Sequence, residues 1–131
     1  MSAPAVRTLP PAESSLPGIL VDPAWLAAHL DDPQVLVVDV TTFLVRTATG
    51  VRPESGRSTH LDAHIPGAVF ADLLDVFTAP EPVRFTALDS DRFAAAAGGL
   101  GIDGSVDVVV YDHGENEWAT RLWWNLRLEG H

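Results

Sequence analysis

The stretch VVVYDHGENEWATRLWW, residues 108–124, predicts a buried strand, a short polar turn and then a helix. The strand is rich in β-branched residues and begins near residue 106. The helix is predicted from about Glu117 to Leu128, with Gly130 as its C′ residue. At such a junction the loop amides lie at the N-terminus of the helix, where they stabilise an anion or a nucleophile. The turn contains no Cys, Ser or Thr, and the residue that leaves the strand is the carboxylate Asp112.

Further strands and helices alternate along the rest of the chain. Residues 35–40, VLVVDV, are typical of a strand buried on both faces, and residues 68–71 predict a shorter strand. Helices are predicted over residues 23–30, with Asp22 as N-cap, and from a cap near Ser90 to the glycines at 98 and 99. We interpret residues 41–60 as a long excursion with at most one irregular helical turn, and residues 73–86 as mostly loop. The alternation predicts an α/β fold with a central, mostly parallel sheet covered on both faces.

Composition excludes several classes of function. The 131 residues suffice for one domain, and 47% hydrophobic residues predict a core. The net charge of −10, with arginine as the only basic residue type apart from histidine, argues against a nucleic-acid partner. The absence of cysteine excludes disulfides, thiolate catalysis and Cys-ligated zinc. No apolar run approaches the roughly 18 residues of a membrane span. Residues 1–18 are proline-rich and unlike a signal peptide, so we predict a flexible arm and a cytoplasmic protein without a membrane partner.

Four stretches, in order and spacing, resemble the rhodanese-like sulfurtransferases. They are LVDPAWLAAHLDDPQVLVVDV (20–40), AHIPGAVFADL (63–73), FAAAAGGLGI (93–102) and VVVYDHGENEWATRLWWNLRLEGH (108–131). The match is to the N-terminal domain of the two-domain members, the thiosulfate and 3-mercaptopyruvate sulfurtransferases, and it covers about residues 19–131. The resemblance implies a three-layer α/β fold whose parallel sheet carries an active loop after its fourth strand. In active domains a cysteine opens that loop and carries sulfur as a persulfide.

The resemblance also implies that this domain is not catalytic by itself. In two-domain members the cysteine lies in the C-terminal domain, and an acidic residue commonly replaces it in the N-terminal one, as Asp112 does here. The inactive equivalent of the active loop is then Asp112, His113, Gly114, Glu115, Asn116 and Glu117, and no residue is assigned a catalytic role. The acidic side chains would repel a dianion such as thiosulfate. Two departures from the family pattern, Ala63 in place of Gly and Thr41 in place of Arg, agree with an inactive domain.

The resemblance further implies a strand and a second domain after the last helix. In the family, we expect that strand to lie between the strand at residues 35–40 and the one at residues 106–111. Without it, both would face a gap, and the domain at residues 19–131 would be incomplete at its C-terminus and aggregation-prone. The expected partner is a C-terminal catalytic rhodanese domain. No cofactor is expected, and the oligomeric state is left open.

Several site residues have alternative interpretations. Asp112 is either an amide-capping group, which we favour, or the acid–base group of a hydrolase built on the loop from Asp112 to Glu117. The same loop could hold a hard cation, but it lacks the twelve-residue calcium pattern. A metal-binding pair of His60 and His64 on one helix is disfavoured by the Pro-Gly turn that follows.

His64 matches a histidine that helps position substrate near the interdomain cleft of the mercaptopyruvate-type enzymes. The alternative is a histidine that bonds backbone and shapes the Pro-Gly turn. Arg121 either contacts an anion or pairs with Glu117 at i, i+4, which we favour. We expect at least one of Trp118, Trp123 and Trp124 to meet the partner domain. Beyond the sulfurtransferase domain, the remaining hypothesis is a regulatory or binding rhodanese-like module.

Overall fold

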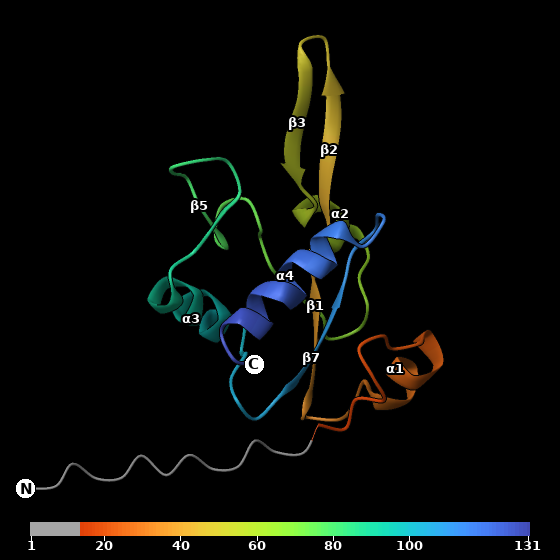
Figure 1. The fold of residues 1–131 in the computed structure, drawn as a ribbon. Coiled ribbons are helices and arrows are strands. Elements are labelled where there is room, and N and C mark those ends of the chain that lie inside the picture. The colour runs from red at the N-terminus through yellow and green to blue at the C-terminus, as the bar shows by residue number, and fades with distance from the viewer. Residues whose placement is uncertain (1–13) are drawn as a thin grey trace, which may run out of the picture.

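The computed structural model describes residues 14–131, and these form an α/β domain around a parallel sheet (Figure 1). The sheet has the order β4-β1-β7, in which β1 is Val35–Asp39, β4 is Val69–Phe70 and β7 is Asp107–Tyr111. All three strands run in the same direction. The predicted fold class is therefore confirmed.

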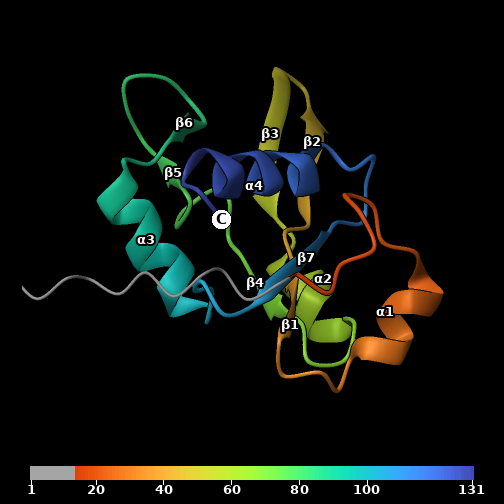
Figure 2. The ribbon, with the colours of Figure 1, turned by 60° about the horizontal axis from the view of Figure 1, so that its bottom comes forward.

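Helices cover the two faces of the sheet, as Figures 1 and 2 show from two sides. Alternate residues of each strand point to opposite faces. On one face Val37 packs with Leu26 of α1 (Pro23–His29). On the other face Val38 packs with residues of α3 (Ser90–Gly99) and α4 (Glu117–Leu128), including the fully buried Leu122. Burial of each such side chain stabilises the fold by about 1.5–3 kcal/mol.

The helix ends follow the local sequence signals. The Asp22 side chain accepts a hydrogen bond of 2.8 Å from the Trp25 amide, with Pro23 as the first residue of α1. Helix α4 has the predicted bounds, and Gly130 beyond it has a φ of 87°, the left-handed conformation of a C′ glycine. The cap of α3 is Asp89, whose carboxylate accepts from the Arg92 amide, and not Ser90. Ser90 is the first helical residue.

The interpretation of residues 41–60 as an irregular excursion is wrong. The segment forms an antiparallel hairpin of β2 (Thr42–Thr47) and β3 (Gly50–Ser55), followed by the helix α2 (Arg57–Asp62). The hairpin projects away from the sheet (Figure 1). Pro53 weakened the strand signal, yet an isolated two-stranded ribbon tolerates proline because both strands are edges. A second small pair, β5 (Thr78–Ala79) and β6 (Thr86–Ala87), lies in the segment that we interpreted as mostly loop.

The expected gap between the strands at residues 35–40 and 106–111 does not exist. Strands β1 and β7 are direct neighbours, paired from Val35 opposite Asp107 to Asp39 opposite Tyr111. The reasoning that the two strands lack partners on their facing edges is therefore wrong.

Most of the predicted arm, residues 1–13, lies outside the described residues. At its end, the amide and hydroxyl of Ser15 both donate to the Asp107 carboxylate at 2.9 Å. Among the helices of residues 14–131, none has the length and apolar character needed to cross a bilayer.

Candidate functional site

The carboxyl ends of parallel strands are where ligands usually bind in α/β sheets, and here that edge carries three aspartates. Asp39 ends β1, Asp72 follows β4 by two residues, and Asp112 follows β7 directly. Each carboxylate accepts hydrogen bonds from backbone amides of its own loop. The edge is therefore negatively charged and largely occupied by its own turns.

Asp112 organises the loop that joins β7 to α4. Its Oδ1 accepts from the amides of Gly114 at 2.7 Å and Asn116 at 3.3 Å, and its Oδ2 accepts from the Ala119 amide in the first turn of α4 at 2.9 Å. Asn116, the residue at the N-cap position, is left-handed with a φ of 68° and makes no capping bond through its own side chain. The Asp112 carboxylate thus supplies the negative charge that a helix N-terminus favours. The interpretation of Asp112 as an amide-capping group is confirmed.

The remaining loop residues do not converge on a common point. His113, Glu115 and Glu117 are exposed. Arg121 donates to the Phe85 carbonyl and forms no ion pair with Glu117, so the predicted i, i+4 pair is wrong. The described residues contain no group of three or more His, Cys, Asp or Glu side chains arranged to hold a metal ion.

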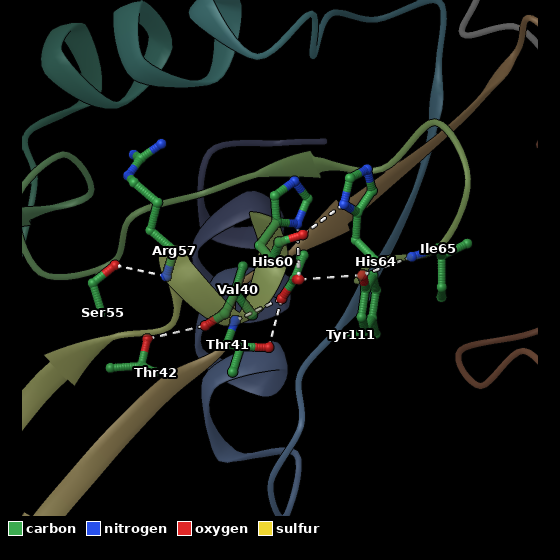
Figure 3. A network of polar contacts seen from close by, with 10 residues as sticks. Val40, Thr41, Thr42, Ser55, Arg57, His60, His64, Ile65 and Tyr111 are labelled. Atoms are coloured by element: carbon green, nitrogen blue, oxygen red, sulfur yellow. Dashed lines mark hydrogen bonds and ion pairs between the residues drawn. The ribbon is translucent and has the colours of Figure 1, made fainter. Parts of the chain in front are cut away.

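A buried polar network centred on Asp39 lies at the same edge of the sheet (Figure 3). The Asp39 side chain is 0% exposed and accepts four hydrogen bonds. Thr41 donates its amide at 2.9 Å and its hydroxyl at 2.6 Å. His60 Nδ1 donates at 3.0 Å, and the Tyr111 hydroxyl donates at 3.2 Å. The network joins β1, β7 and α2 through one carboxylate.

The network also shifts the pKa of two of its members. Burial alone would raise the pKa of Asp39, but the hydrogen bonds from Thr41, His60 and Tyr111 outweigh it and hold that pKa below the ordinary value of 3.8. Burial raises the pKa of Tyr111, and the neighbouring Asp39 carboxylate raises it further. The ionised carboxylate and the neutral phenol are therefore the stable pair at neutral pH.

His64 is joined to this network from the loop that precedes β4. Its Nδ1 donates to the His60 carbonyl at 2.6 Å, and its ring stacks on the His60 ring with centroids 4.0 Å apart. The next residue, Ile65, donates its amide to the Tyr111 hydroxyl at 3.2 Å. With Nδ1 as donor, a neutral His64 ring carries its free lone pair at Nε2. His64 therefore makes the backbone bond expected of a turn-shaping residue, while the side chain itself stays exposed.

The close approach between the network and the hairpin depends on Gly56. Its amide donates to the Thr41 carbonyl at 2.8 Å, and a Cβ added at Gly56 would lie 2.3 Å from that oxygen. Thr41, one of the two departures from the family pattern, is itself 1% exposed.

Sequence reasoning did not identify the Asp39 network. Asp39 stood within an apolar strand, and His60 was weighed only as a metal ligand. The available signal was an acidic residue in an otherwise apolar run, since a carboxylate buried in a strand needs donors nearby.

Comparison with known proteins gives one family. The model of the rhodanese-like domain matches residues 22–131. The 3-mercaptopyruvate sulfurtransferase of Escherichia coli K12 is 33% identical over 106 residues, which cover 81% of this chain and 36% of that enzyme. Thiosulfate/3-mercaptopyruvate sulfurtransferase 2 of Arabidopsis thaliana is 32% identical over 121 residues, which cover 92% of this chain and 33% of that protein.

A solved structure agrees. The crystal structure of a 3-mercaptopyruvate sulfurtransferase from Escherichia coli superposes with a TM-score of 0.67 at 32% identity, over 79% of this chain and 38% of that one. The chain thus spans about a third of the length of the relatives it matches. The family model, the sequence relatives and the solved structure all indicate the same family, so this chain belongs to the rhodanese-like domain family.

Proposed function

We propose that this chain is the N-terminal, non-catalytic rhodanese-like domain of a two-domain thiosulfate/3-mercaptopyruvate sulfurtransferase. It packs on a catalytic rhodanese domain and forms one wall of the substrate cleft. A cytoplasmic location belongs to the same proposal and rests on the sequence features given above.

The proposal rests on the state of Asp112. A sulfurtransferase loop needs a thiolate that is free to attack a sulfur donor. The loop amides and the helix N-terminus lower the pKa of the cysteine thiol so that this thiolate forms. Here those amides are bonded to a carboxylate, and the chain has no cysteine. A carboxylate cannot form a persulfide, and its charge opposes the binding of an anionic donor at the same amides.

Exposed apolar side chains on α4 and beside the His64 loop support packing on another domain. Trp124 and Leu128 on α4 are 53% and 63% exposed, and Leu61 on α2 is 73% exposed. The relatives named above extend well beyond the part that this chain matches, since the match covers only 36% of the Escherichia coli enzyme.

The first test is activity. The purified chain should form no thiocyanate from thiosulfate and cyanide and should not consume 3-mercaptopyruvate, with the Escherichia coli enzyme as positive control. Asp112→Cys should also be inactive, because Glu115 and Glu117 remain and the loop has no basic residue other than His113. Turnover above a heat-killed sample in the unchanged chain would overturn the proposal.

The second test is replacement. Residues 22–131 should restore 3-mercaptopyruvate turnover when they replace the matched part of the Escherichia coli enzyme. In that chimera, His64→Ala should raise KM for 3-mercaptopyruvate about tenfold, equivalent to about 1.4 kcal/mol of binding. His29→Ala is the matched control, because His29 also bonds a carbonyl four residues earlier, at 2.7 Å, and stacks on that residue's ring. A folded but inactive chimera would favour a regulatory or binding module instead.

A further inference from the structure

A hollow lies between the β2–β3 hairpin and the segment that carries β5 and β6, which stand at the same end of the molecule in Figures 1 and 2. Its volume is about 430 Å³, within the usual range of small-molecule sites. Neither His64 nor the loop from Asp112 to Glu117 lines it. Its apolar lining consists of Pro53, Leu74, Ala79, Pro80 and Phe85. The hollow is therefore a site separate from the two described above.

Two arginines complete the lining of this hollow. The chain has eight arginines and a net charge of −10, so two cationic side chains around one hollow stand out against an acidic surface. Arg84 is exposed, and within residues 14–131 no carboxylate forms an ion pair with its guanidinium group. Arg52 Nη2 lies 3.2 Å from Glu54 Oε2, but the two side chains are 64% and 52% exposed, and such a surface pair contributes little. An anion in the hollow therefore meets one unpaired and one weakly paired guanidinium group.

The wall that carries Arg84 is a tightly held turn. Strands β5 and β6 pair with each other, and residues 83–86 close a hydrogen-bonded turn beside them. Phe85, the third residue of that turn, has a φ of 65°, at a position where glycine is usual. Its carbonyl accepts a hydrogen bond from Arg121, and its ring meets the Trp118 ring edge to face, with centroids 5.7 Å apart. A bulky residue keeps such a conformation only where its surroundings hold it there, so the backbone of Arg84 is fixed beside the hollow.

The other walls are also fixed by their own bonds. Pro53 lies in β3, opposite Leu44 of β2 in the antiparallel pairing. The Leu74 amide donates to the Asp72 carboxylate at 2.9 Å, and the Thr78 hydroxyl donates to the carbonyl of the residue before Leu74. A ligand would therefore order only the two arginine side chains, which keeps the entropic cost of binding small.

We propose that this hollow binds a small organic carboxylate with an apolar body. The carboxylate lies between the guanidinium groups of Arg84 and Arg52, whose planar donors match its two oxygens. The apolar body packs on Phe85, Leu74 and the two prolines. A compact inorganic anion would contact the arginines alone and leave this apolar lining in water. The proposal is independent of the proposed sulfurtransferase role, because it uses no residue of the loop between β7 and α4.

The test is a titration of the whole chain with phenylacetate, followed through the backbone amide signals of Leu74, Ala79 and Phe85 by nuclear magnetic resonance. Two comparison ligands separate the contributions to binding. Acetate carries the charge without the apolar body, and phenylacetamide carries the body without the charge. We expect saturable shifts at these amides with phenylacetate, at a Kd about tenfold below that of either comparison ligand.

Four variants test the assignment of the arginines. Arg84→Gln should raise the Kd for phenylacetate about tenfold, and Arg52→Gln should raise it less because Arg52 is shared with Glu54. Glu54→Gln should lower the Kd about twofold, because it frees the Arg52 guanidinium group. Arg46→Gln is the matched control, since Arg46 is an exposed arginine of the same hairpin that does not line the hollow, and it should leave the Kd unchanged.

Three results would overturn the proposal. The first is the absence of a saturable shift with phenylacetate, and the second is an affinity for acetate equal to that for phenylacetate. The third is a Kd in Arg84→Gln no higher than in Arg46→Gln. Circular dichroism checks that every variant keeps its fold, which substitutions at these exposed positions should not disturb.

Discussion

Replacing Asp39 by alanine should destabilise this domain more than any other single loss of a carboxylate. Asp39 is 0% exposed and accepts all four hydrogen bonds of its network. Its removal leaves the two donors of Thr41 and the Nδ1–H of His60 without an acceptor. Thr41 is 1% exposed and His60 is 8% exposed. The Tyr111 hydroxyl is only half-buried and can turn to water.

The magnitude follows from those donors. Each buried donor left without an acceptor costs about 1–3 kcal/mol, and the loss of Asp39 leaves three such donors, two on Thr41 and one on His60. We expect Asp39→Ala to lower the free energy of unfolding by about 3–5 kcal/mol. A domain is stable by only about 5–15 kcal/mol, so this loss is a large fraction of the total.

The measurement is urea unfolding followed by tryptophan fluorescence and circular dichroism. Asp39→Asn should lose less than Asp39→Ala, because the remaining carbonyl oxygen still accepts from Thr41 while the amide cannot accept from His60. Asp62→Ala, at an exposed position on α2, is the control and should stay within about 0.5 kcal/mol of the parent. A loss below about 1 kcal/mol in Asp39→Ala, at an unchanged m-value, would refute the reasoning.

Three further outcomes are expected. The pKa of Asp39 in the folded state lies below the ordinary value of 3.8, so the stabilisation from the ionised carboxylate is complete above pH 3.8 and is lost as the pH falls through the folded-state pKa. A pH titration of the urea midpoint should show this loss, and Asp39→Asn should flatten the pH dependence. Asp112→Ala removes three amide partners at the start of α4 and should cost about 1–2 kcal/mol by urea unfolding, whereas the exposed Glu115→Ala should cost almost nothing; equal losses would contradict the capping role. Gly56→Ala should lower the free energy of unfolding by about 1–3 kcal/mol because the added Cβ would meet the Thr41 carbonyl, whereas Gly98→Ala, with open space around it in α3, should raise it by about 0.5–1 kcal/mol. If thermal unfolding shows the opposite order for the two variants, the close approach at Gly56 is contradicted.

Local signals predicted the elements whose causes lie within a few residues. The Asp22-Pro23 pair sets the start of α1, the Val-rich run sets β7, and Gly130 marks the end of α4. Each depends on a cap, on side-chain periodicity or on one backbone conformation, and all of these are readable along the chain. The hairpin at residues 42–55 was not predicted because its stability depends on pairing between two strands, and because Pro53 interrupts the strand pattern of the sequence.

The sequence by itself determined the α/β class and the chemistry of the loop after β7, because strand periodicity, helix caps and the absence of a thiol are properties of the chain. Only the tertiary structure decided which strands are neighbours. Within residues 14–131 it pairs β1 with β7 directly and gives β7 no strand on its other edge, because strand order depends on contacts between segments some seventy residues apart. It also decided that Asp39, His60 and Tyr111 share one buried network. A carboxylate in a strand shows that donors are needed, but only the packed fold shows which residues supply them.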